Sequence, residues 1–468
     1  MRKTTSQSHK AHTHQTVTAE IKFKAGGKTI QITSTEQKLS AHAGQATFWS
    51  YLHKCKFREL LGRVLPHRPK SNNHLPPVDT ACGYIGGVVA GADRLTRVAW
   101  LRGDPVLPEI MAVERIASQS TLSRFFGFFK SAASSLECFR PLWRWTMEQA
   151  PARREGYTLD LDTSSLIHED GHQEGVAVGH TRLGLKPCHQ PMLAVLAEIK
   201  LCVQFWLRPG NVHCTNNLIN FTEELLRQLP HHLHLRLIRA DSGFQDDRWQ
   251  SLLEEKKLPY IVVADMSPRM KSLIKGIKHW EATEIEGVEV TSVMYESKYA
   301  SRPRRVVIMR RRIGAPGRGG GKLLLDCPGY KYQALVTSLP ESYTALQVWF
   351  EYNGRANIEN VIKELKGGFG LGGFCCKGFY ATEAALCLAV MAYNLTALFA
   401  RHLGWLDKVT INTLRYRLFH RAGIISQSQG RTTVRLGIPK EIRGWWNELW
   451  EKLLSPYPNC NAVGQTPC

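Results

Sequence analysis

The stretch YNGRANIENVIKELK at residues 352–366 places an aromatic hydroxyl, two cations and an acid at irregular intervals. At about 100° per residue on a helix, these four side chains project within a sector of roughly 60°. They are Tyr352, Arg355, Glu359 and Lys366. The apolar face lies directly beside this sector and consists of Ile358, Val361, Ile362, Leu365 and Phe369. We therefore expect the four side chains to lie at the edge of a buried face and to point into a site.

A solvated stripe of ion pairs is the alternative interpretation of the same residues. Glu359 has Arg355 four residues before it and Lys363 four residues after it, which is the spacing of helical ion pairs. This alternative accounts for the charges but leaves Tyr352 and Lys366 unexplained.

Two aspartates upstream follow apolar segments. YTLDLDTSSL at residues 157–166 alternates and leads to Asp162, and HLRLIRADSGF at residues 234–244 leads to Asp241. Acids at the exits of neighbouring strands converge at the carboxyl edge of a sheet, where α/β folds place their sites. Two nearby buried anions need a cation, and Mg²⁺ prefers carboxylate oxygen. Alternatively, each aspartate only caps a turn.

Each aspartate has a rival. Asp160 shares a strand face with Asp162, and Asp265 stands at the end of IVVAD, a further predicted strand.

The charge of the chain indicates a polyanionic partner. Among 468 residues, 61 Lys and Arg against 40 Asp and Glu leave a net charge of +21, with a pI near 9.6. Nucleic acid is the commonest partner of so basic a protein. Membrane-surface binding would require a basic amphipathic helix or a lipid-modified end, and the sequence contains neither.

The remaining composition favours an intracellular globular protein. Twelve cysteines without any C-x-x-C predict reduced thiols and no structural zinc site. The N-terminus lacks the apolar core of a signal peptide. The apolar segment 384–400 contains Tyr393 and Asn394, so we expect a buried core helix rather than a membrane span.

The chain divides into six predicted parts. They are a flexible basic tail (1–40), a helical N-terminal DNA-binding domain (41–150), the first part of an α/β core (151–266), a β-rich insertion outside the core sheet (267–345), the second part of the core (346–403) and a small helical C-terminal region (404–468). Within the N-terminal part, SQSTLSR resembles the start of a recognition helix, with Ser118 or Ser120 as cap and Arg124 near phosphate. A plain helical packing domain is the alternative.

These features together resemble the DDE transposases of bacterial insertion sequences, in particular the group with a Y-R-E-K signature helix. The spacing Tyr-x2-Arg-x3-Glu-x6-Lys matches that signature, and LDLDTSS and IRADSGF stand where the group carries its two aspartates. The resemblance covers roughly residues 155–403, and ASQSTLSRF (117–125) is similar to the N-terminal domain of the family.

The resemblance implies a ribonuclease H-like mixed-sheet catalytic core with the insertion between the second aspartate and the glutamate. It implies that Asp162, Asp241 and Glu359 are the catalytic residues and hold Mg²⁺, with Mn²⁺ as a substitute. Asp162 is preferred to Asp160 because a small hydroxyl residue, Thr163, follows it. Tyr352, Arg355 and Lys366 would hold phosphates beside the cut.

The implied partners are double-stranded DNA, as terminal inverted repeats and as target, and a second copy of the chain on paired ends. The implied location is the cytoplasm of a bacterium, at the nucleoid. No nucleotide is expected, because PGRGGGK (316–322) lacks the spacing of a phosphate-binding loop. A nuclease without strand transfer and an inactive DNA-binding regulator are the alternative functions.

Basic residues of the insertion are expected to follow the DNA backbone. They are Arg302, Arg304, Arg305, Arg310, Arg311, Arg312, Arg318 and Lys322. If the reaction passes through a hairpin, Trp280, Trp349 or Tyr299 would hold a flipped base.

Overall fold

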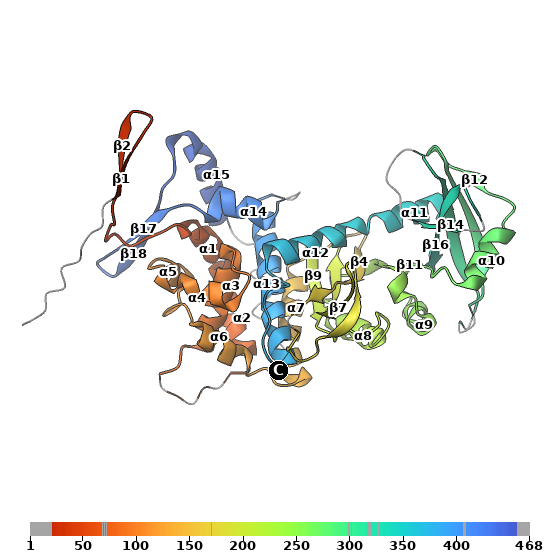
Figure 1. Cartoon of the computed structure of the whole chain (residues 1–468), viewed down its shortest axis with the longest axis horizontal. Helices are drawn as coiled ribbons and strands as arrows, with labels where there is room; N and C mark the ends of the chain where they lie inside the picture. The colour runs from red at the N-terminus through yellow and green to blue at the C-terminus, as the bar shows by residue number, and fades with distance from the viewer. Residues whose placement is uncertain are drawn as a thin grey trace, which may run out of the picture.

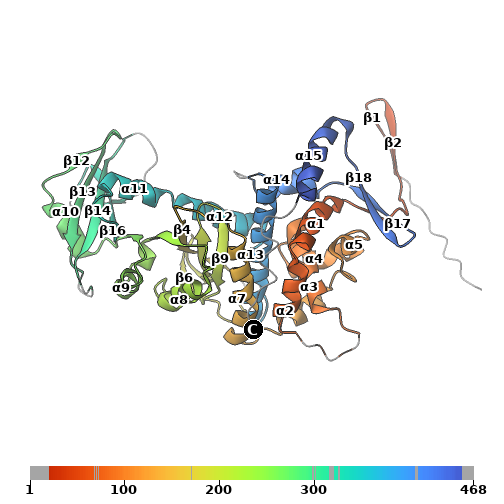
Figure 2. The ribbon, with the colours of Figure 1, turned by 180° about the vertical axis from the view of Figure 1, so that it is seen from behind.

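The computed structural model describes residues 21–455, apart from residues 68, 70, 72, 170, 298–299, 301, 316–320, 325–326 and 406–408. Figure 1 shows a molecule drawn out along one axis, and the view from behind in Figure 2 has the same order of parts. The N-terminal helices and the C-terminal segments lie together at one end, a mixed sheet lies in the middle, and the strands of residues 281–337 form the other end.

The N-terminal part is mainly helical. Its elements are β1 (Ile21–Ala25), β2 (Lys28–Ile32), β3 (Leu39–Ser40), α1 (Ala46–Lys54), α2 (Phe57–Val64), α3 (Pro77–Ala90), α4 (Leu95–Trp100), α5 (Leu107–Met111), α6 (Gln119–Phe126) and α7 (Ala132–Glu148), with short 3-10 turns at Ala43–Gln45 and Leu101–Gly103. Of the two serines expected to cap α6, Ser118 does so by accepting a hydrogen bond from Thr121 N at 3.2 Å.

The predicted tail 1–40 contains regular structure in its described half, which corrects that prediction. β1 and β2 form an antiparallel hairpin, and β3 pairs with a C-terminal strand. Gly26 and Gly27 both have positive φ, so the hairpin has the two-residue turn that suits twisted strands.

The central sheet is mixed. Its strands are β4 (Tyr157–Thr163), β8 (Met192–Leu196), β9 (Leu201–Trp206), β10 (Leu235–Ala240) and β11 (Tyr260–Val263), in the order β9-β8-β4-β10-β11. β4, β10 and β11 run parallel, whereas β8 is antiparallel to β4 and β9 is antiparallel to β8. Nearly every residue of these strands is buried, because helices including α8 (Leu218–Gln228) and α9 (Asp247–Glu255) cover the sheet.

A small second sheet lies between β4 and β8 in the sequence. It consists of β5 (Leu166–Ile167), β6 (Ala177–Thr181) and β7 (Gly184–His189), in the order β5-β7-β6. β6 and β7 form a tight hairpin whose turn is Arg182 and Leu183.

The insertion continues the central sheet, contrary to the prediction that it stands outside it. Its elements are α10 (Pro268–Gly276), β12 (Glu281–Ala282), β13 (Val288–Tyr295), β14 (Arg304–Arg312), β15 (Lys322–Leu323) and β16 (Tyr330–Thr337). β16 pairs antiparallel with β11, and the sheet reaches ten strands. The physical reason is that β11 would otherwise be an open edge with unpaired backbone groups.

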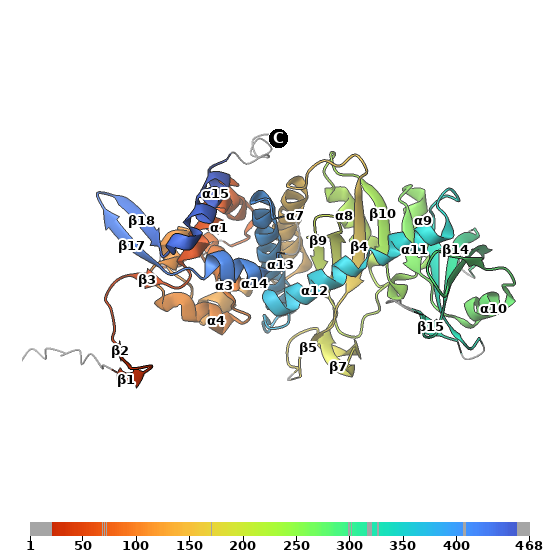
Figure 3. The ribbon, with the colours of Figure 1, turned by 90° about the horizontal axis from the view of Figure 1, so that it is seen from above.

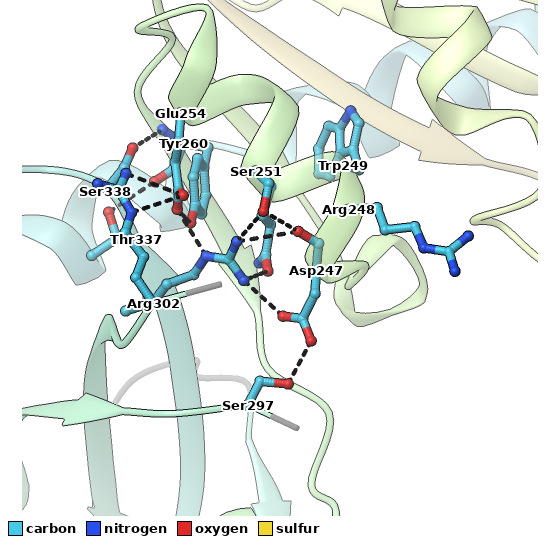
Figure 4. A network of polar contacts seen from close by, with 12 residues as sticks. Asp247, Arg248, Trp249, Ser251, Glu254, Tyr260, Ser297, Arg302, Thr337 and Ser338 are labelled. Atoms are coloured by element: carbon cyan, nitrogen blue, oxygen red, sulfur yellow. Dashed lines mark hydrogen bonds and ion pairs between the residues drawn. The ribbon is translucent and has the colours of Figure 1, made fainter. Parts of the chain in front are cut away.

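A buried ion cluster fastens β14 to α9. Arg304 is 5% exposed and donates to Glu254 at 2.8 Å and to Asp247 at 2.7 Å. Figure 4 shows the two acids with Tyr260 beside them, and the Tyr260 hydroxyl donates to Glu254 at 2.7 Å. Arg302 also pairs with Glu254, at 3.1 Å. Two arginines that we expected to follow DNA therefore hold the insertion to the core.

Two helices carry the Y-R-E-K residues, not one. α11 (Ala345–Asn353) ends at Gly354 and α12 (Ala356–Gly368) begins after Arg355. In a continuous helix the carbonyl of Glu351 would accept from Arg355 N. Instead it accepts from Arg239 Nη1, and Arg355 N donates to Tyr352 O at 2.9 Å. Figure 3 shows α11 and α12 running in line from the centre of the molecule to the insertion.

The apolar segment forms a core helix, α13 (Phe379–His402), as expected. It is long and apolar enough to cross a membrane, but 94% of its most apolar window is buried inside the protein. Its polar Asn394 pairs with both backbone groups of Cys202 on β9, at 2.9 and 2.6 Å. That pairing satisfies a polar side chain in an apolar interior.

The C-terminal part is not wholly helical. Its elements are α14 (Ile411–Leu414), a π-helical turn at Arg415–Phe419, β17 (Gly423–Ser428), β18 (Arg431–Leu436), a 3-10 turn at Lys440–Ile442 and α15 (Arg443–Leu454). β17 and β18 form a hairpin around Gln429 and Gly430, both with positive φ. This turn chemistry, typical of hairpins, is the signal that the prediction of a helical region missed.

Candidate active site

Asp162 lies at the end of β4, where the strand leaves the sheet. Its Oδ1 accepts a hydrogen bond from Thr163 N at 2.8 Å, and the residue is 9% exposed. Burial raises the pKa of Asp162 to about 6, although the neighbouring Arg355 guanidinium opposes that rise. Asp162 is thus a nearly buried acid whose charge depends on a nearby cation.

Asp241 follows β10, which pairs in parallel with β4. The two aspartates therefore leave the sheet at the same edge, as the strand pattern predicted. Asp241 also caps a short 3-10 turn, Ser242–Phe244, by accepting from Gly243 N at 3.0 Å. Its side chain is 41% exposed and remains open to a ligand.

Glu359 on α12 completes one side of a cleft of about 1160 Å³. The cleft is also lined by Asp162, Asp241, Arg355 and Lys366. In the described part of the chain, no ion pair joins Glu359 to Arg355 or Lys363, so the expected alternative of a solvated ion-pair stripe does not form. The structure brings together three acids from three separate segments.

Arg355 lies between the two aspartates. Its Nη2 is 3.1 Å from Asp162 Oδ2 and 3.9 Å from Asp241 Oδ2, and it donates to Leu161 O at 3.1 Å. Only 7% of the residue is exposed. Burial acts to lower the pKa of Arg355, but the nearby Asp162, Tyr352, Asp241 and Asp160 together outweigh burial and the pKa is raised. Arg355 therefore supplies the positive charge that two adjacent carboxylates need.

The rivals of the two aspartates have other roles. Asp160 is fully buried, and Arg239 donates to both of its carboxylate oxygens, at 2.6 and 2.9 Å. Asp265 is exposed and is not among the residues that line the cleft. Of the two acids on β4, Asp162 faces the cleft.

The sequence model of the transposase DDE domain, group 1, matches residues 23–443. The chain belongs to this transposase family. The match confirms the resemblance found in the Y-R-E-K helix. A solved structure that is also similar is the piggyBac transposase synaptic complex with hairpin DNA, determined by cryo-EM; it is 11% identical with a TM-score of 0.42, and the match covers 82% of this chain and 81% of that chain. No curated protein matches.

Membership of the family makes this protein an enzyme that cuts and joins DNA, and enzymes of the family generally use divalent metal ions. In the described residues, no group of three His, Cys, Asp or Glu is placed to hold a metal. The donor chemistry of the transposase nevertheless suits a hard cation, because three carboxylates face one cleft. Arg355 occupies the position between two of them.

The two remaining signature residues differ in their access to the cleft. Lys366 of the transposase lines the cleft, and its Nζ donates to Ser165 O at 2.8 Å. Tyr352 is 9% exposed and packs in a hydrophobic cluster with residues such as Trp349 and Val348. It is therefore buried behind Arg355 rather than open to DNA.

The other basic residues predicted to bind DNA also differ. Arg124 is exposed on α6. Arg311 is 7% exposed and donates to Ala315 O at 3.5 Å, so its burial corrects the prediction that it follows the DNA backbone. Arg310 is paired with Glu289 at 2.7 and 3.1 Å. Arg318 lies outside the described residues.

None of the aromatic residues predicted to hold a flipped base lines the cleft in the described part of the transposase. Trp349 is buried and donates to Gln333 at 3.1 Å, and Trp280 stacks under Arg310 at 4.3 Å. Tyr299 lies outside the described residues.

Two parts of the site escaped the sequence analysis. Arg239, which holds Asp160 and the end of α11, stands two residues before Asp241 in LIRADSGF; a cation inside an apolar strand was the available signal. The β6–β7 hairpin lines the cleft with its turn and one face. Gly184, which directly follows its turn, was a weak signal.

Proposed function

We propose that this transposase cuts the ends of an insertion sequence and joins the freed 3′-OH ends to target DNA at the cleft described above. The convergence of Asp162, Asp241 and Glu359, together with Arg355 and Lys366, carries this proposal. The acids suit a divalent cation and the cations suit a phosphate, so the cleft matches both parts of a phosphoryl-transfer site.

The arrangement of the central sheet supports a ribonuclease H-like core. Three antiparallel strands, β9, β8 and β4, are followed by β10 and β11 parallel to β4. The two aspartates lie at the ends of the first and fourth strands of this core in chain order, and the glutamate follows on a helix after the insertion. We propose the same domain boundaries that the sequence analysis predicted.

Asp162, Asp241 and Glu359 would hold the metal, which we propose to be Mg²⁺ with Mn²⁺ as substitute. When two such ions are bound, they supply the charge that activates the attacking hydroxyl and stabilises the leaving 3′ oxygen. In the free protein Arg355 neutralises Asp162. A metal ion that took over this role would leave the guanidinium available to bind the scissile phosphate bidentately.

One set of residues can serve both steps. Water is the nucleophile of cleavage, and the 3′-OH that cleavage releases takes its place in joining. No covalent bond to the enzyme is required, and the buried position of Tyr352 agrees with a role in support of Arg355 rather than as a nucleophile. Lys366 would bind a phosphate beside the cut as a point charge.

The partners that we propose are double-stranded DNA, as terminal inverted repeats and target, and a second copy of the chain. The net charge of +21 supports DNA binding, and the exposed Arg124 on α6 would contribute. We expect light scattering to detect a dimer when paired end DNA is added. An unchanged mass with and without end DNA would contradict this assembly.

The decisive experiment incubates the purified protein with Mg²⁺ and DNA that carries the repeats flanking its gene. We expect metal-dependent nicks at the repeat ends and joined products with target DNA, and we expect Glu359→Gln to bind the ends without nicking. A Glu359→Gln variant that nicks normally would overturn the assigned acids. Nicks without joined products would indicate a nuclease, and binding by the wild type without nicks would indicate an inactive regulator.

A further inference from the structure

The β6–β7 hairpin presents a largely apolar face to the catalytic cleft, with His180 as its polar member. Val178 and Leu185 are 59% and 62% exposed, and Leu183 in the turn is 73% exposed. Val178 and Leu185 lie on one face of the hairpin, since Val178 pairs with Pro187 and His180 pairs with Leu185. All three line the same cleft as Asp162 and Glu359. A cluster of exposed apolar side chains in a cleft is typical of a binding surface.

The opposite face fixes the hairpin in place. A Cβ added at Gly179 would lie 1.9 Å from Gly210 O, so the backbone of the hairpin rests directly on the neighbouring loop. Gln190 Nε2 donates to His180 O at 2.8 Å, and Ser165 Oγ donates to the same carbonyl at 3.3 Å. These contacts hold the hairpin in position, with Val178 and Leu185 on the face opposite Gly179.

Two cations lie beside this face. Arg182 in the turn and Lys366 on α12 both line the cleft. Partial burial lowers the pKa of Lys366, and the nearby Arg182 charge lowers it further. Lys366 is held in this position because its Nζ donates to Ser165 O, next to the hairpin. Two like charges facing a common space favour an anion between them.

We propose that the β6–β7 hairpin binds an unpaired end of DNA beside the cut, with Arg182 and Lys366 on one phosphate and with Leu183, Leu185 and Val178 on the faces of unstacked bases. This inference rests on the proposed function in taking DNA as the substrate. It adds the state of that DNA, because a fully paired duplex presents charged backbone and polar groove edges. Base faces are apolar surfaces of the right kind, and they become available only when the stack is opened.

A second copy of the chain is the other occupant that an apolar face could accept. The adjacent Arg182 and Lys366 favour DNA, because the occupant must bring an anion together with its apolar surface. The hairpin is also continuous with the wall that carries the catalytic acids. The occupant is therefore the same molecule that reaches Glu359.

The test compares two DNA probes on the full-length protein by fluorescence anisotropy in buffer without divalent cations. One probe is a blunt duplex, and the other has the same duplex with a few unpaired bases at one end. We expect the wild type to bind the forked probe about fivefold or more tightly than the blunt one, because the cost of unpairing is already met. The double variant Leu183→Ser, Leu185→Ser should bind both probes equally, with a ratio of about one.

Matched controls separate the contribution of the apolar side chains from that of the Arg182 charge. Met294→Ser removes a side chain of similar exposure, 60%, on β13 and outside the cleft, so it should keep the wild-type ratio. Arg182→Gln should weaken binding of both probes and lower the salt dependence by about one phosphate contact. Thermal unfolding of each variant checks that the hairpin substitutions leave the fold intact, as expected for exposed positions.

The outcomes are distinct from those of the nicking experiment. An unchanged probe ratio in the double variant would overturn the hairpin inference. The inference would also fail if the wild type formed a dimer without DNA and the double variant lost it in light scattering, because the hairpin would then bind a second copy of the chain. If the wild type nicks repeat ends but the double variant keeps its forked preference, only this inference fails. If the double variant loses that preference but the wild type never nicks, the inference stands and the proposed function fails.

Discussion

The guanidinium of Arg355 lies 3.1 Å from the carboxylate of Asp162, between the two aspartates at the edge of the sheet. The same nitrogen is 3.9 Å from Asp241. Because both Arg355 and Asp162 are nearly buried, water solvates neither charge well. The free transposase thus balances its acidic site with its own signature arginine.

Arg355→Gln should therefore strengthen metal binding and weaken catalysis. Without the guanidinium, the two aspartates repel each other, and we expect Mn²⁺ to bind the DNA-free protein about three- to tenfold more tightly. Nicking of repeat ends should fall about 10²-fold or more, because a positioned cation is lost from the phosphate. Isothermal titration measures the first effect and a gel assay the second.

Two controls accompany this prediction. Arg355→Lys keeps a cation and should retain most of the wild-type metal affinity. Arg124→Gln removes an exposed arginine outside the cleft and should leave Mn²⁺ binding unchanged. Equal or weaker Mn²⁺ binding by Arg355→Gln would contradict competition between the arginine and the metal.

The break between α11 and α12 depends on Gly354. A Cβ added there would lie 2.5 Å from Arg239 Nη1, the atom that donates to Glu351 O and ends α11. We expect Gly354→Ala to lower the free energy of unfolding by about 1–3 kcal/mol and to reduce nicking, because Arg239 or the start of α12 must shift. Urea denaturation and the gel assay measure both.

Gly367→Ala is the matched control on α12. Nothing lies within 4 Å of a Cβ at this position, and alanine favours the helix. We expect a gain of about 0.5–1 kcal/mol in the free energy of unfolding. If both variants had the same stability, the contact of Gly354 with Arg239 would not be what requires glycine.

Arg304 is predicted to hold the insertion to the core. Arg304→Gln leaves Asp247 and Glu254 without their buried partner, so we expect a loss of about 3–5 kcal/mol in the free energy of unfolding. Limited proteolysis should then cut first within residues 281–337. Arg144→Gln removes an exposed pair with Glu148 on α7 and should cost less than about 0.5 kcal/mol. If Arg304→Gln and Arg144→Gln lost the same free energy of unfolding, the ion cluster around Arg304 would not be what holds the insertion to the core.

The site was predictable from the sequence where local pattern decides structure. The alternation before Asp162 and the apolar run before Asp241 predicted strand ends, and parallel pairing then brings such ends to one edge. Ser118 at the start of α6 and the apolar segment of α13 were predicted for similarly local reasons.

The rest depends on partners distant in the sequence. Nothing within residues 352–366 reveals that Arg239 on another strand takes the carbonyl of Glu351 and divides the helix. Likewise, a run of arginines in β14 is typical of a DNA-binding surface, but Arg304 finds two buried acids on α9. The sheet continues into the insertion because β11 and β16 pair, and strand pairing at this separation leaves no mark in either segment.

The hairpin that faces the cleft should loosen in mild acid. His168 and His189 share a hydrogen bond of 3.0 Å, and burial together with the His189 charge lowers the pKa of His168 to about 4. Burial also lowers the pKa of His189. Both stay neutral in the folded protein while they take up protons in the unfolded chain below about pH 6.5. Their contribution to stability is therefore complete above that pH and is lost as pH falls toward 4.

We expect the melting temperature to fall between pH 7 and pH 5 and the fall to be smaller in His168→Gln. The substitution removes one group that binds a proton only on unfolding, so it reduces the pH slope rather than the stability at neutral pH. His213→Gln, at an exposed loop position, should keep the wild-type slope. A His168→Gln slope equal to that of the wild type would place the acid sensitivity elsewhere. The expected result has two parts: His168→Gln reduces the slope, and only the wild type loses binding of the forked DNA below pH 6. Both together would show that the position of the hairpin depends on these two imidazole rings.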